Sequence, residues 1–592
     1  MCVLCQEQTS DPLVCPARNK TEQRATGYQT LANNLQNFRE IQYIPVNIVI
    51  DLLDEGNGIE KTLITHSESR ALIIGQEQYA TFVEERIDKC ARALTDTIPK
   101  NKLSLFGNMN RQSTKGKSQV VSLQNDCNLF ARMYIGCQAR DGSLEEFFKH
   151  ENQVCPPSLS SMGKLRIGQK SELLDCLYKH SSHENPAVDM KVLDGPVIVN
   201  MLTPNSRTKT FHDYATGIFL PYIIRQSNGV KRMDVVWDKY DANSLKQSAR
   251  EARGQGIRRR ISSKTTIPSN WKSFLRSDEN KSELFAFLAE QIASLNIDGV
   301  QVISTKLEDV VSSTPVEKEG IAPCNHEEAD SRIMLHVAQG AAQGHAKIMI
   351  KTVDTDIVVL ATAYVVKLSI QELWVDFGVG KHTRCIPAHK IAQDLGPDTC
   401  EALPFFHSIT GCDTVSAFAG RGKKTAFEAW RAYPDITTVF RTLSKTPTSV
   451  TEQQIKSLQR FVVLMYSRTS SLSSVNEARQ ALFAQGTRTI QNIPPTEAAL
   501  IEHIKRAVYQ GGHVWGQALV PIQLLPSPSD WGWEPSMQGW KPKWTVLPEA
   551  SKACQELVHC GCKKACRGNC KCTKASLPCS ALCMCGGNCH QE

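Results

Sequence analysis

The middle of the chain alternates between short apolar runs and segments with helical spacing. Between residues 186 and 445 four apolar runs are predicted to contain strands, namely MKVLDGPVIVNML, RMDVVWD, KIMIKTVDTDIVVLA and ELWVDFG. Apolar residues recur at helical spacing in NKSELFAFLAEQIASL, EEADSRIMLHVAQGAA and KTAFEAWRAY. Because strands that alternate with helices are typical of βαβ units, this region is predicted to be an α/β domain with a parallel sheet flanked by helices.

Three further regions surround this predicted domain. Residues 1–185 mix amphipathic stretches with polar loops, which predicts a mostly helical region whose role the sequence does not reveal. Residues 446–550 hold two amphipathic helix candidates, followed by a Pro- and Trp-rich stretch that we interpret as an ordered arm or linker. Residues 554–590 form a cysteine-rich tail.

Composition and charge restrict the class of protein only broadly. The net charge of the 592 residues is +8, and 41% of them are hydrophobic, which is ordinary for a globular protein. No run of about 18 uncharged apolar residues is present. The first residues, MCVLCQEQTSDPLVC, lack the basic and apolar parts of a signal peptide. We therefore expect a nuclear protein, with the cytoplasm as the alternative.

Seven acidic residues lie mostly at the edges of apolar runs. Such acids are costly to bury unless they are paired or bound to cations. The carboxyl ends of parallel strands meet at one edge of a sheet, so these acids are predicted to converge on a shared crevice. Clustered carboxylates are the ligands that two Mg²⁺ or Mn²⁺ ions require. The seven are Asp194, Asp238, Glu328, Asp330, Asp354, Asp356 and Asp413.

Two of these motifs also have simpler explanations. Glu328 and Asp330 open a helix, where acids are common because they compensate the helix dipole. Positions i and i+2 face apart on a regular helix, so both acids reach one metal only from an irregular first turn. Asp354 and Asp356 form an Asp-x-Asp motif that phosphatases of the haloacid dehalogenase type also carry, although those favour Thr where this chain has Val358.

Taken in order, the acidic motifs resemble the flap endonuclease (5′-nuclease) branch of the PIN-like fold. The resemblance rests on Glu-x-Asp at a helix start, Asp-x-Asp at a strand end, and Gly-Cys-Asp followed by Gly-x-Gly-Lys-Lys-x-Ala. Asp194 and Asp238 resemble that family's first-strand and second-strand aspartates. The resemblance covers about residues 187–445 and implies hydrolysis of phosphodiester bonds in DNA or RNA, with Mg²⁺ or Mn²⁺ held by the seven acids.

Basic residues near the acidic motifs are candidates for contact with nucleic acid. Lys246, Arg250 and Arg253 form an i, i+4, i+7 stripe, which on its own is typical of a solvated helix face. Lys246 and Arg253 match the spacing of a Lys and an Arg that the family places over its active site. Further candidates for phosphate contact are Arg258, Arg259, Arg260 and, resembling the family's helix-two-turn-helix, Gly420, Gly422, Lys423 and Lys424.

The tail contains a dense array of cysteines interleaved with lysines. Neighbouring thiolates repel each other unless they bind a metal, and Zn²⁺ in tetrahedral sites is the expected ion. Nine thiolates do not divide into separate four-ligand sites, so we expect bridging thiolates and about three zinc ions. The pattern resembles a tesmin-type CXC domain, which implies DNA binding; a structural zinc knot is the alternative. The nine are Cys560, Cys562, Cys566, Cys570, Cys572, Cys579, Cys583, Cys585 and Cys589.

The function classes that remain open are a metal-dependent nuclease, a catalytically inactive DNA-binding or regulatory protein derived from a mobile element, and, third, a phosphatase. Four histidines near the acids, His326, His336, His382 and His407, are expected to be polar neighbours and not ligands. Cys2, Cys5 and Cys15 are candidate zinc ligands without an evident fourth.

Overall fold

The structure is a computed structural model that describes residues 79–89, 91, 134, 137, 143–178, 186–241, 244–246, 256–485, 489–537 and 539–553. Arg250, Arg253, the three N-terminal cysteines and the nine tail cysteines lie outside the described residues. The chain divides into two compact units, residues 1–120 and 121–592. In the first unit, residues 79–88 are helical and include η2 (Glu84–Asp88).

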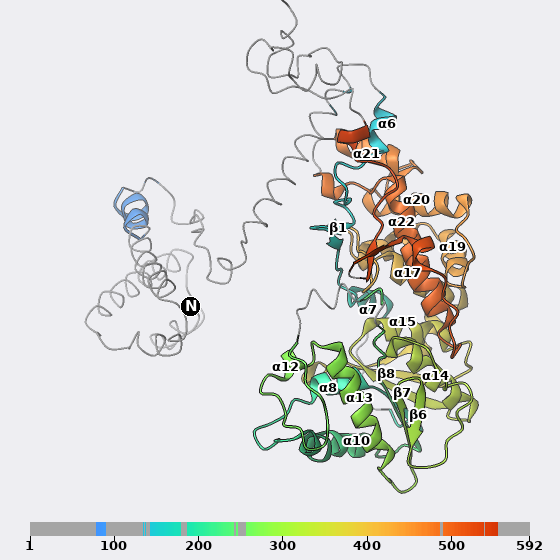
Figure 1. Cartoon of the computed structure of the whole chain (residues 1–592). Coiled ribbons are helices and arrows are strands. Elements are labelled where there is room, and N and C mark those ends of the chain that lie inside the picture. Colours follow the sequence, from blue (N-terminus) through green and yellow to red (C-terminus); the bar gives the residue numbers. More distant parts are fainter. Residues whose placement is uncertain are drawn as a thin grey trace, which may run out of the picture. The chain divides into compact units, whose positions relative to one another are not determined.

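The second unit contains a mixed seven-stranded sheet with the strand order β6-β5-β4-β3-β7-β8-β9. Figure 1 labels β6, β7 and β8 of this sheet among the surrounding helices. The strands are β3 (Met190–Asp194), β4 (Arg232–Val236), β5 (Gln301–Lys306), β6 (Asp309–Ser312), β7 (Lys347–Thr352), β8 (Glu372–Phe377) and β9 (Arg384–Pro387). The five central strands run parallel, and β6 and β9 pair antiparallel at the two edges. The predicted α/β class, with a parallel sheet flanked by helices, is confirmed.

Helices cover both faces of the sheet, as the apolar strands require. In β7, Ile348 and Ile350 enter one hydrophobic core, whereas Met349 enters another. Because successive side chains of a strand point to opposite faces, these two cores lie on opposite sides of the sheet. The first core contains α14 (Ala329–Ala342), α15 (Thr355–Tyr364) and α16 (Ala388–Leu395). The second contains α8 (Gly195–Met201), α9 (Phe211–Tyr214), η3 (Ala215–Phe219), α10 (Leu220–Gln226), α12 (Trp271–Phe274) and α13 (Asp278–Ala293).

Two of the predicted strands are shorter than the apolar runs that suggested them. The residues after Asp194 form α8, and those after Asp354 form α15. In both cases the aspartate is the N-cap: the Asp194 carboxylate accepts from the amide of Val197, and Asp354 accepts from the amide of Asp356. A capping Asp, followed in α8 by Pro196, is a helix-start signal that outweighs the apolar run.

A third and larger core lies among the remaining helices. It contains residues from Cys137 to Ala550, so it crosses both predicted domain boundaries, at 185/186 and at 445/446. Its elements are α6 (Leu144–Phe148), α7 (Glu172–Leu177), α17 (Pro397–Ile409), α18 (Lys423–Ala432), α19 (Ile436–Leu443), α20 (Glu452–Tyr466), α21 (Val475–Ala484), η5 (Ile490–Asn492), α22 (Glu497–Val508), η6 (Tyr509–Val514), η8 (Pro528–Trp531) and α23 (Ala550–Ala553). Shorter elements are β1 (Ser160–Ser161), β2 (Lys164–Leu165), η4 (Gly380–His382) and η7 (Trp515–Gln517).

The Pro- and Trp-rich stretch is ordered, as expected. It contains a hairpin of β10 (Trp533–Ser536) and β11 (Gly539–Pro542). Arg506 of α22 donates to the carbonyls of Gly532 and Lys543, at 2.9 and 2.6 Å, and Trp533 is almost fully buried. These buried bonds attach the stretch to the helical core.

Candidate functional site

The parallel sheet and its helices bring acidic residues to the carboxyl edge of the sheet. Six of the seven acids follow a strand or begin a helix, because strand ends and helix starts meet at this edge in βαβ units. Asp194 ends β3, Asp238 follows β4 by two residues, Glu328 and Asp330 begin α14, Asp354 and Asp356 begin α15, and Asp413 lies in the loop after α17.

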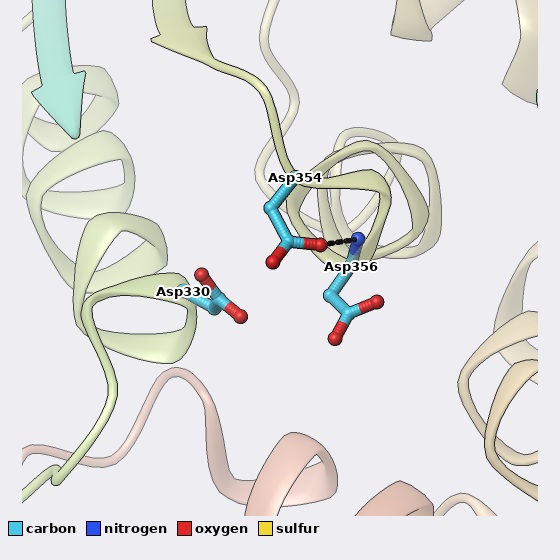
Figure 2. A group of neighbouring side chains, drawn as sticks. All are labelled: Asp330, Asp354 and Asp356. Atoms are coloured by element: carbon cyan, nitrogen blue, oxygen red, sulfur yellow. Dashed lines mark hydrogen bonds between the residues drawn. The ribbon is translucent and has the colours of Figure 1, made fainter. Parts of the chain in front are cut away.

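Three of these acids form a compact group. Asp330, Asp354 and Asp356 each offer a carboxylate oxygen, and these oxygens lie within 4.8 Å of one another (Figure 2). Asp330 is only 9% exposed, and among the described residues its carboxylate has no hydrogen-bond or ion-pair partner. Burial and the negative charges of Asp354, Glu328 and Asp356 raise the pKa of Asp330 well above its ordinary value. A buried, unpartnered carboxyl group that faces two others calls for a cation.

Asp194 and Asp354 are held in place by neighbours at the end of β7. The Thr352 hydroxyl donates to Asp194 Oδ2 at 2.7 Å and accepts from the amide of Asp354 at 3.0 Å. Asp354 Oδ1 in turn accepts from the amide of Asp356 at 3.0 Å, the bond drawn in Figure 2. Burial raises the pKa of Asp194 and of Asp354 to about 7 each, and neighbouring carboxylates add to both shifts.

Glu328 and Asp238 lie at the start of α14. Asp238 Oδ1 accepts from the amide of Ala329 at 2.9 Å. Glu328 is the N-cap residue of α14 and has an extended backbone, so it lies outside the regular helical turns that contain Asp330. Two acids at positions i and i+2 can reach one metal ion only in such an irregular arrangement. Glu328 Oε1 pairs with Lys246 at 2.7 Å, while Glu328 Oε2 is buried without a partner among the described residues. Burial raises the pKa of Glu328.

A lysine that the sequence did not single out lies among these acids. The ammonium of Lys170 is 2.6 Å from Asp413, 2.8 Å from Asp356 and 3.4 Å from Asp354. Burial opposes the charge of Lys170, but the three carboxylates raise its pKa above the ordinary value. Burial would likewise raise the pKa values of Asp356 and Asp413, yet the nearby lysines hold both below their ordinary range.

Lys170 reaches the site because its segment pairs with the loop that carries Asp413. The amide of Ala417 donates to the carbonyl of Arg166, and the amide of Ala419 donates to the carbonyl of Ser158, both at 2.8 Å. Gly168 lies so close to Ala417 that a Cβ on it would be 2.8 Å from the alanine methyl group. No local pattern in the sequence marks this contact, since Lys170 and Asp413 are far apart along the chain.

The histidines near the acids differ in their contacts. His407 is fully buried, and its Nε2 lies 2.8 Å from Asp356 Oδ1. His336 Nδ1 lies 2.6 Å from Asp234 Oδ2, and His326 Nε2 lies 2.8 Å from the carbonyl of Val520. His382 is exposed. Only His407 therefore touches one of the seven acids among the described contacts, and it does so as a hydrogen-bond partner.

A buried polar network fixes α14, and with it Asp330, against the sheet. Arg232 and Asp234 of β4 form an ion pair at 2.6 Å, and both side chains are almost fully buried. Arg232 also donates to Gln339 of α14 and to Gln343, the C-cap residue of α14, at 2.8 and 2.7 Å. Burial would raise the pKa of Asp234, but Arg232 holds it below its ordinary value. Because Arg232 bonds to Gln339 and Asp234 lies 2.6 Å from His336, both residues of β4 are tied to α14, and the network sets the position of α14 relative to β4.

The glycine-lysine turn has a different arrangement from the one expected for phosphate contact. Lys423 is 2% exposed, and its ammonium donates to the carbonyl of His407 and to the Thr410 hydroxyl. Burial lowers the pKa of Lys423 to about 7. The Lys423 ammonium is therefore engaged within the protein, whereas Lys424 is exposed, and phosphate contact by this turn stays a prediction.

Two glycines of this turn have internal reasons to be glycine. Gly420 is exposed and has a φ of +65°, in the left-handed region that favours glycine. A Cβ on Gly422 would be 2.3 Å from a carboxylate oxygen of Glu172, at the start of α7. The sequence attributed both to the approach of a duplex, but the left-handed backbone of Gly420 and the Glu172 carboxylate beside Gly422 give reasons for glycine within the chain itself.

The basic run after the second acid is partly engaged with the protein itself. Arg258 pairs with Glu279, at 2.5 Å, and with Glu283. Arg259 donates to the carbonyl and hydroxyl of Thr266, at 2.6 and 3.0 Å. Arg260 is exposed, so it is the member of this run that is best placed to meet a ligand.

Comparisons with known proteins give little further information. The sequence matches no protein-family model and no curated protein. Among solved structures, the T5 D15 protein co-crystallized with metal ions shares 12% identity, over 56% of this chain and 91% of that chain, with a TM-score of 0.29. A putative arginyl-tRNA synthetase from Campylobacter jejuni shares 9% identity, over 60% and 98%, with a TM-score of 0.14. Both scores are too low to support an argument about fold or function.

The described part of the chain also bears on membrane association. None of its helices is both long enough and apolar enough to cross a bilayer.

Proposed function

We propose that this protein is a divalent-metal-dependent nuclease that hydrolyses phosphodiester bonds in DNA or RNA. The observation that carries the proposal is Asp330, a buried carboxyl group without a partner among the described residues, which faces Asp354 and Asp356. The order of the acidic motifs, with its resemblance to the flap endonuclease branch of the PIN-like fold, supports the same conclusion.

The donor set of the site fits a hard divalent cation. Asp330, Asp354 and Asp356 offer oxygen ligands only, which suits Mg²⁺ or Mn²⁺ and disfavours softer ions. Asp194, Asp238 and Glu328 are the next acids available to it, directly or through water. When bound, the ion would supply Lewis acidity that favours attack by water and offsets charge on the phosphate.

The protein itself supplies position and charge. Thr352 and the amide of Asp356 orient Asp194 and Asp354, so these two carboxylates would be held in place for an ion bound directly or through water. Lys246 lies beside Glu328 and 3.5 Å from Asp413, where its ammonium is placed to hold a phosphate oxygen. In the reaction the oxygen of water bonds to phosphorus, the bond from phosphorus to the leaving strand breaks, and a proton passes to the leaving oxygen.

Binding of the nucleic-acid strand is proposed to involve basic residues around the site. The candidates at the surface are Lys424 and Arg260, together with Arg250 and Arg253 from outside the described residues. Such contacts release counterions, so binding should weaken steeply as salt increases.

One observation favours a second candidate, a catalytically inactive nucleic-acid-binding protein. Lys170 and Lys246 together form ion pairs with Asp354, Asp356, Asp413 and Glu328, so part of the negative charge is already neutralised without a metal. If these lysines were the only cations that the acids bind, the site would bind no metal and would be an inactive remnant of a nuclease site.

Metal binding separates these two functions. Calorimetric titration of the full chain with Mn²⁺ should show binding that Asp330→Asn weakens by about tenfold or more, which is about 1.4 kcal/mol. Asp309→Asn is the control, because Asp309 is a carboxylate of the same unit that pairs with Lys318 away from the site. The absence of Mn²⁺ binding to the wild type would favour the inactive protein.

The cysteine tail, which lies outside the described residues, is proposed to bind zinc and to assist DNA binding. Elemental analysis of the purified full chain should give about three zinc ions per chain, as expected if nine thiolates share bridging positions. A preparation with an intact tail and no zinc would remove the CXC interpretation. A tail that holds zinc but leaves DNA affinity unchanged when deleted would be a structural knot.

A further inference from the structure

The ammonium of Lys170 is surrounded by carboxylates in the way that a bound cation would be. Its three partners, Asp413, Asp356 and Asp354, come from two separate segments, and their oxygens lie 2.6, 2.8 and 3.4 Å from the nitrogen. The Lys170 side chain is 19% exposed. An ammonium has three N–H donors and one positive charge, so three acceptors satisfy it.

The acids around Lys170 overlap with those of the compact triad. Asp354 and Asp356 belong to both sets, whereas Asp330 belongs only to the triad and Asp413 only to the lysine set. Asp354 and Asp356 are therefore shared by two neighbouring positions that a cation can occupy. Lys170 fills the position next to Asp413, and the position next to Asp330 has no positive group bonded to Asp330 among the described residues.

We infer that Lys170 is a built-in cation that permanently takes the second position, so that the site binds one divalent ion, beside Asp330, and not two. The inference rests on the proposed function, because it concerns the same acidic site. In this arrangement Lys170 is a positioning residue, which holds Asp354 and Asp356 at the spacing that the ion needs.

The structure gives reasons why a metal ion does not displace this lysine. Displacement would break three ion pairs. The pair with Asp356, whose side chain is 1% exposed, is shielded from water and is therefore the strongest of the three. The segment that carries Lys170 is bonded to the loop of Asp413 through Arg166 and Ser158, so the lysine and its partner acid are positioned together. Gly168 packs against Ala417 without room for a Cβ, which fixes the segment two residues before the lysine.

The two positions would therefore differ in their chemical roles. An ammonium offers charge and hydrogen bonds but is not a Lewis acid, so Lys170 neutralises carboxylates and orients them without activating water. Removing the ammonium while keeping the acids should open the second position to a second ion.

The test is the number of Mn²⁺ ions that the full chain binds, in the wild type and in Lys170→Met. Titration calorimetry and native mass spectrometry count the ions, and electron paramagnetic resonance reports whether two Mn²⁺ ions are close enough to couple magnetically. The expected result is one ion with an uncoupled spectrum for the wild type, and two ions with a coupled spectrum for Lys170→Met. Lys170→Arg retains the positive charge and should bind one ion. It provides a second test if Lys170→Met does not fold.

Lys351 provides a matched control on β7, the strand that ends just before Asp354. Lys351 is 12% exposed and pairs with Asp376 at 2.6 Å. Its side chain points to the face of the sheet opposite to Thr352, so Lys351→Met removes an equally buried, paired lysine without opening the site. This variant should bind one ion, as the wild type does.

Each other outcome overturns the inference in an identifiable way. Two coupled ions in the wild type would show that the metal displaces Lys170, with the proposed function intact. One ion in both the wild type and Lys170→Met would show that the second position is not a cation site. No ion in the wild type or in any variant would overturn the proposed function as well.

Discussion

Replacing the unpartnered acid, by Asp330→Asn, should stabilise the metal-free protein while it weakens metal binding. Asparagine has nearly the same size and shape as aspartate but carries no charge. The substitution therefore removes the repulsion between Asp330 and the other two acids of the triad without creating a cavity. A surface carboxylate replaced in the same way has almost no effect on stability.

The magnitude follows from the spacing of the triad. The oxygens lie within 4.8 Å of each other, and two unit charges at that distance repel by about 3.5 kcal/mol at an effective dielectric constant of about 20. Compensation by Lys246, whose charge opposes the shift in the pKa of Asp330, reduces the net gain to about 2 kcal/mol. A gain of that size corresponds to a rise in melting temperature of about 2 °C for a folded unit of this size.

The gain should depend on pH with a definite sign. An acid whose pKa is raised in the folded state binds its proton more tightly there than in the unfolded chain. Stability is therefore lost as pH rises above the unfolded value of about 3.9 and toward the raised value in the folded protein. Because Asn carries no such proton, the difference in stability between Asp330→Asn and the wild type should be smaller at pH 5 than at pH 8.

The assay is thermal unfolding of both proteins in EDTA and in excess Mn²⁺, at pH 5 and pH 8. In EDTA at pH 8 the variant should melt higher, and Mn²⁺ should stabilise the wild type more than the variant. Asp309→Asn, whose carboxylate has a pKa lowered by Lys318, should not gain stability. A variant that melts at or below the wild-type temperature in EDTA at pH 8, with an unchanged response to Mn²⁺, would refute the reasoning.

Three further predictions concern the acids, the basic turn and the network behind α14. Mn²⁺ affinity should increase by about tenfold between pH 6 and pH 8, because the pKa of Asp194 is about 7 and its proton must leave before it supports a cation; calorimetry that shows equal affinity at both pH values would contradict this. Lys424→Ala should weaken nucleic-acid binding and reduce its salt dependence in a filter or fluorescence assay, whereas Lys423→Met should leave binding unchanged, since Lys423 is buried. Arg232→Met should lower the free energy of unfolding by about 3 kcal/mol, because it leaves the buried Asp234 without its charged partner and with only the hydrogen bond to His336. Chemical denaturation without a shift in midpoint would exclude this role.

Much of the fold follows from the sequence because the strands are buried on both faces. Runs such as KIMIKT and ELWVDF contain apolar residues that face two different cores. A strand buried on both faces needs apolar residues at successive positions, and this pattern can be read from the sequence. The helix starts at Asp194 and Asp354 were harder to place, because an apolar run of four to eight residues fits a strand or a buried helix equally well. In both cases the capping aspartate, and not the apolar run, determines the structure.

The candidate site was predictable where it depends on strand ends and was not predictable where it depends on distant segments. Asp330, Asp354 and Asp356 come together because α14 and α15 start at the same edge of the sheet. Lys170 comes from a region to which the sequence assigned no role, and only the pairing of its segment with residues 416–419 brings it to Asp413. Similarly, the burial of Lys423 depends on the packing of α17 against α18 and has no local signature.

The central claim is that the acids at the carboxyl edge of the sheet support metal-dependent cleavage of nucleic acid. The most direct test incubates the full chain with flap, single-stranded and duplex substrates in Mn²⁺, next to Asp354→Asn, which keeps the oxygen that caps α15 but removes the charge. The wild type should cleave at least one substrate, EDTA should stop cleavage, and Asp354→Asn should be slower by on the order of 100-fold, or about 2.7 kcal/mol. Cleavage by a folded Asp354→Asn at the wild-type rate, or no cleavage by a wild type that binds Mn²⁺, would contradict the claim.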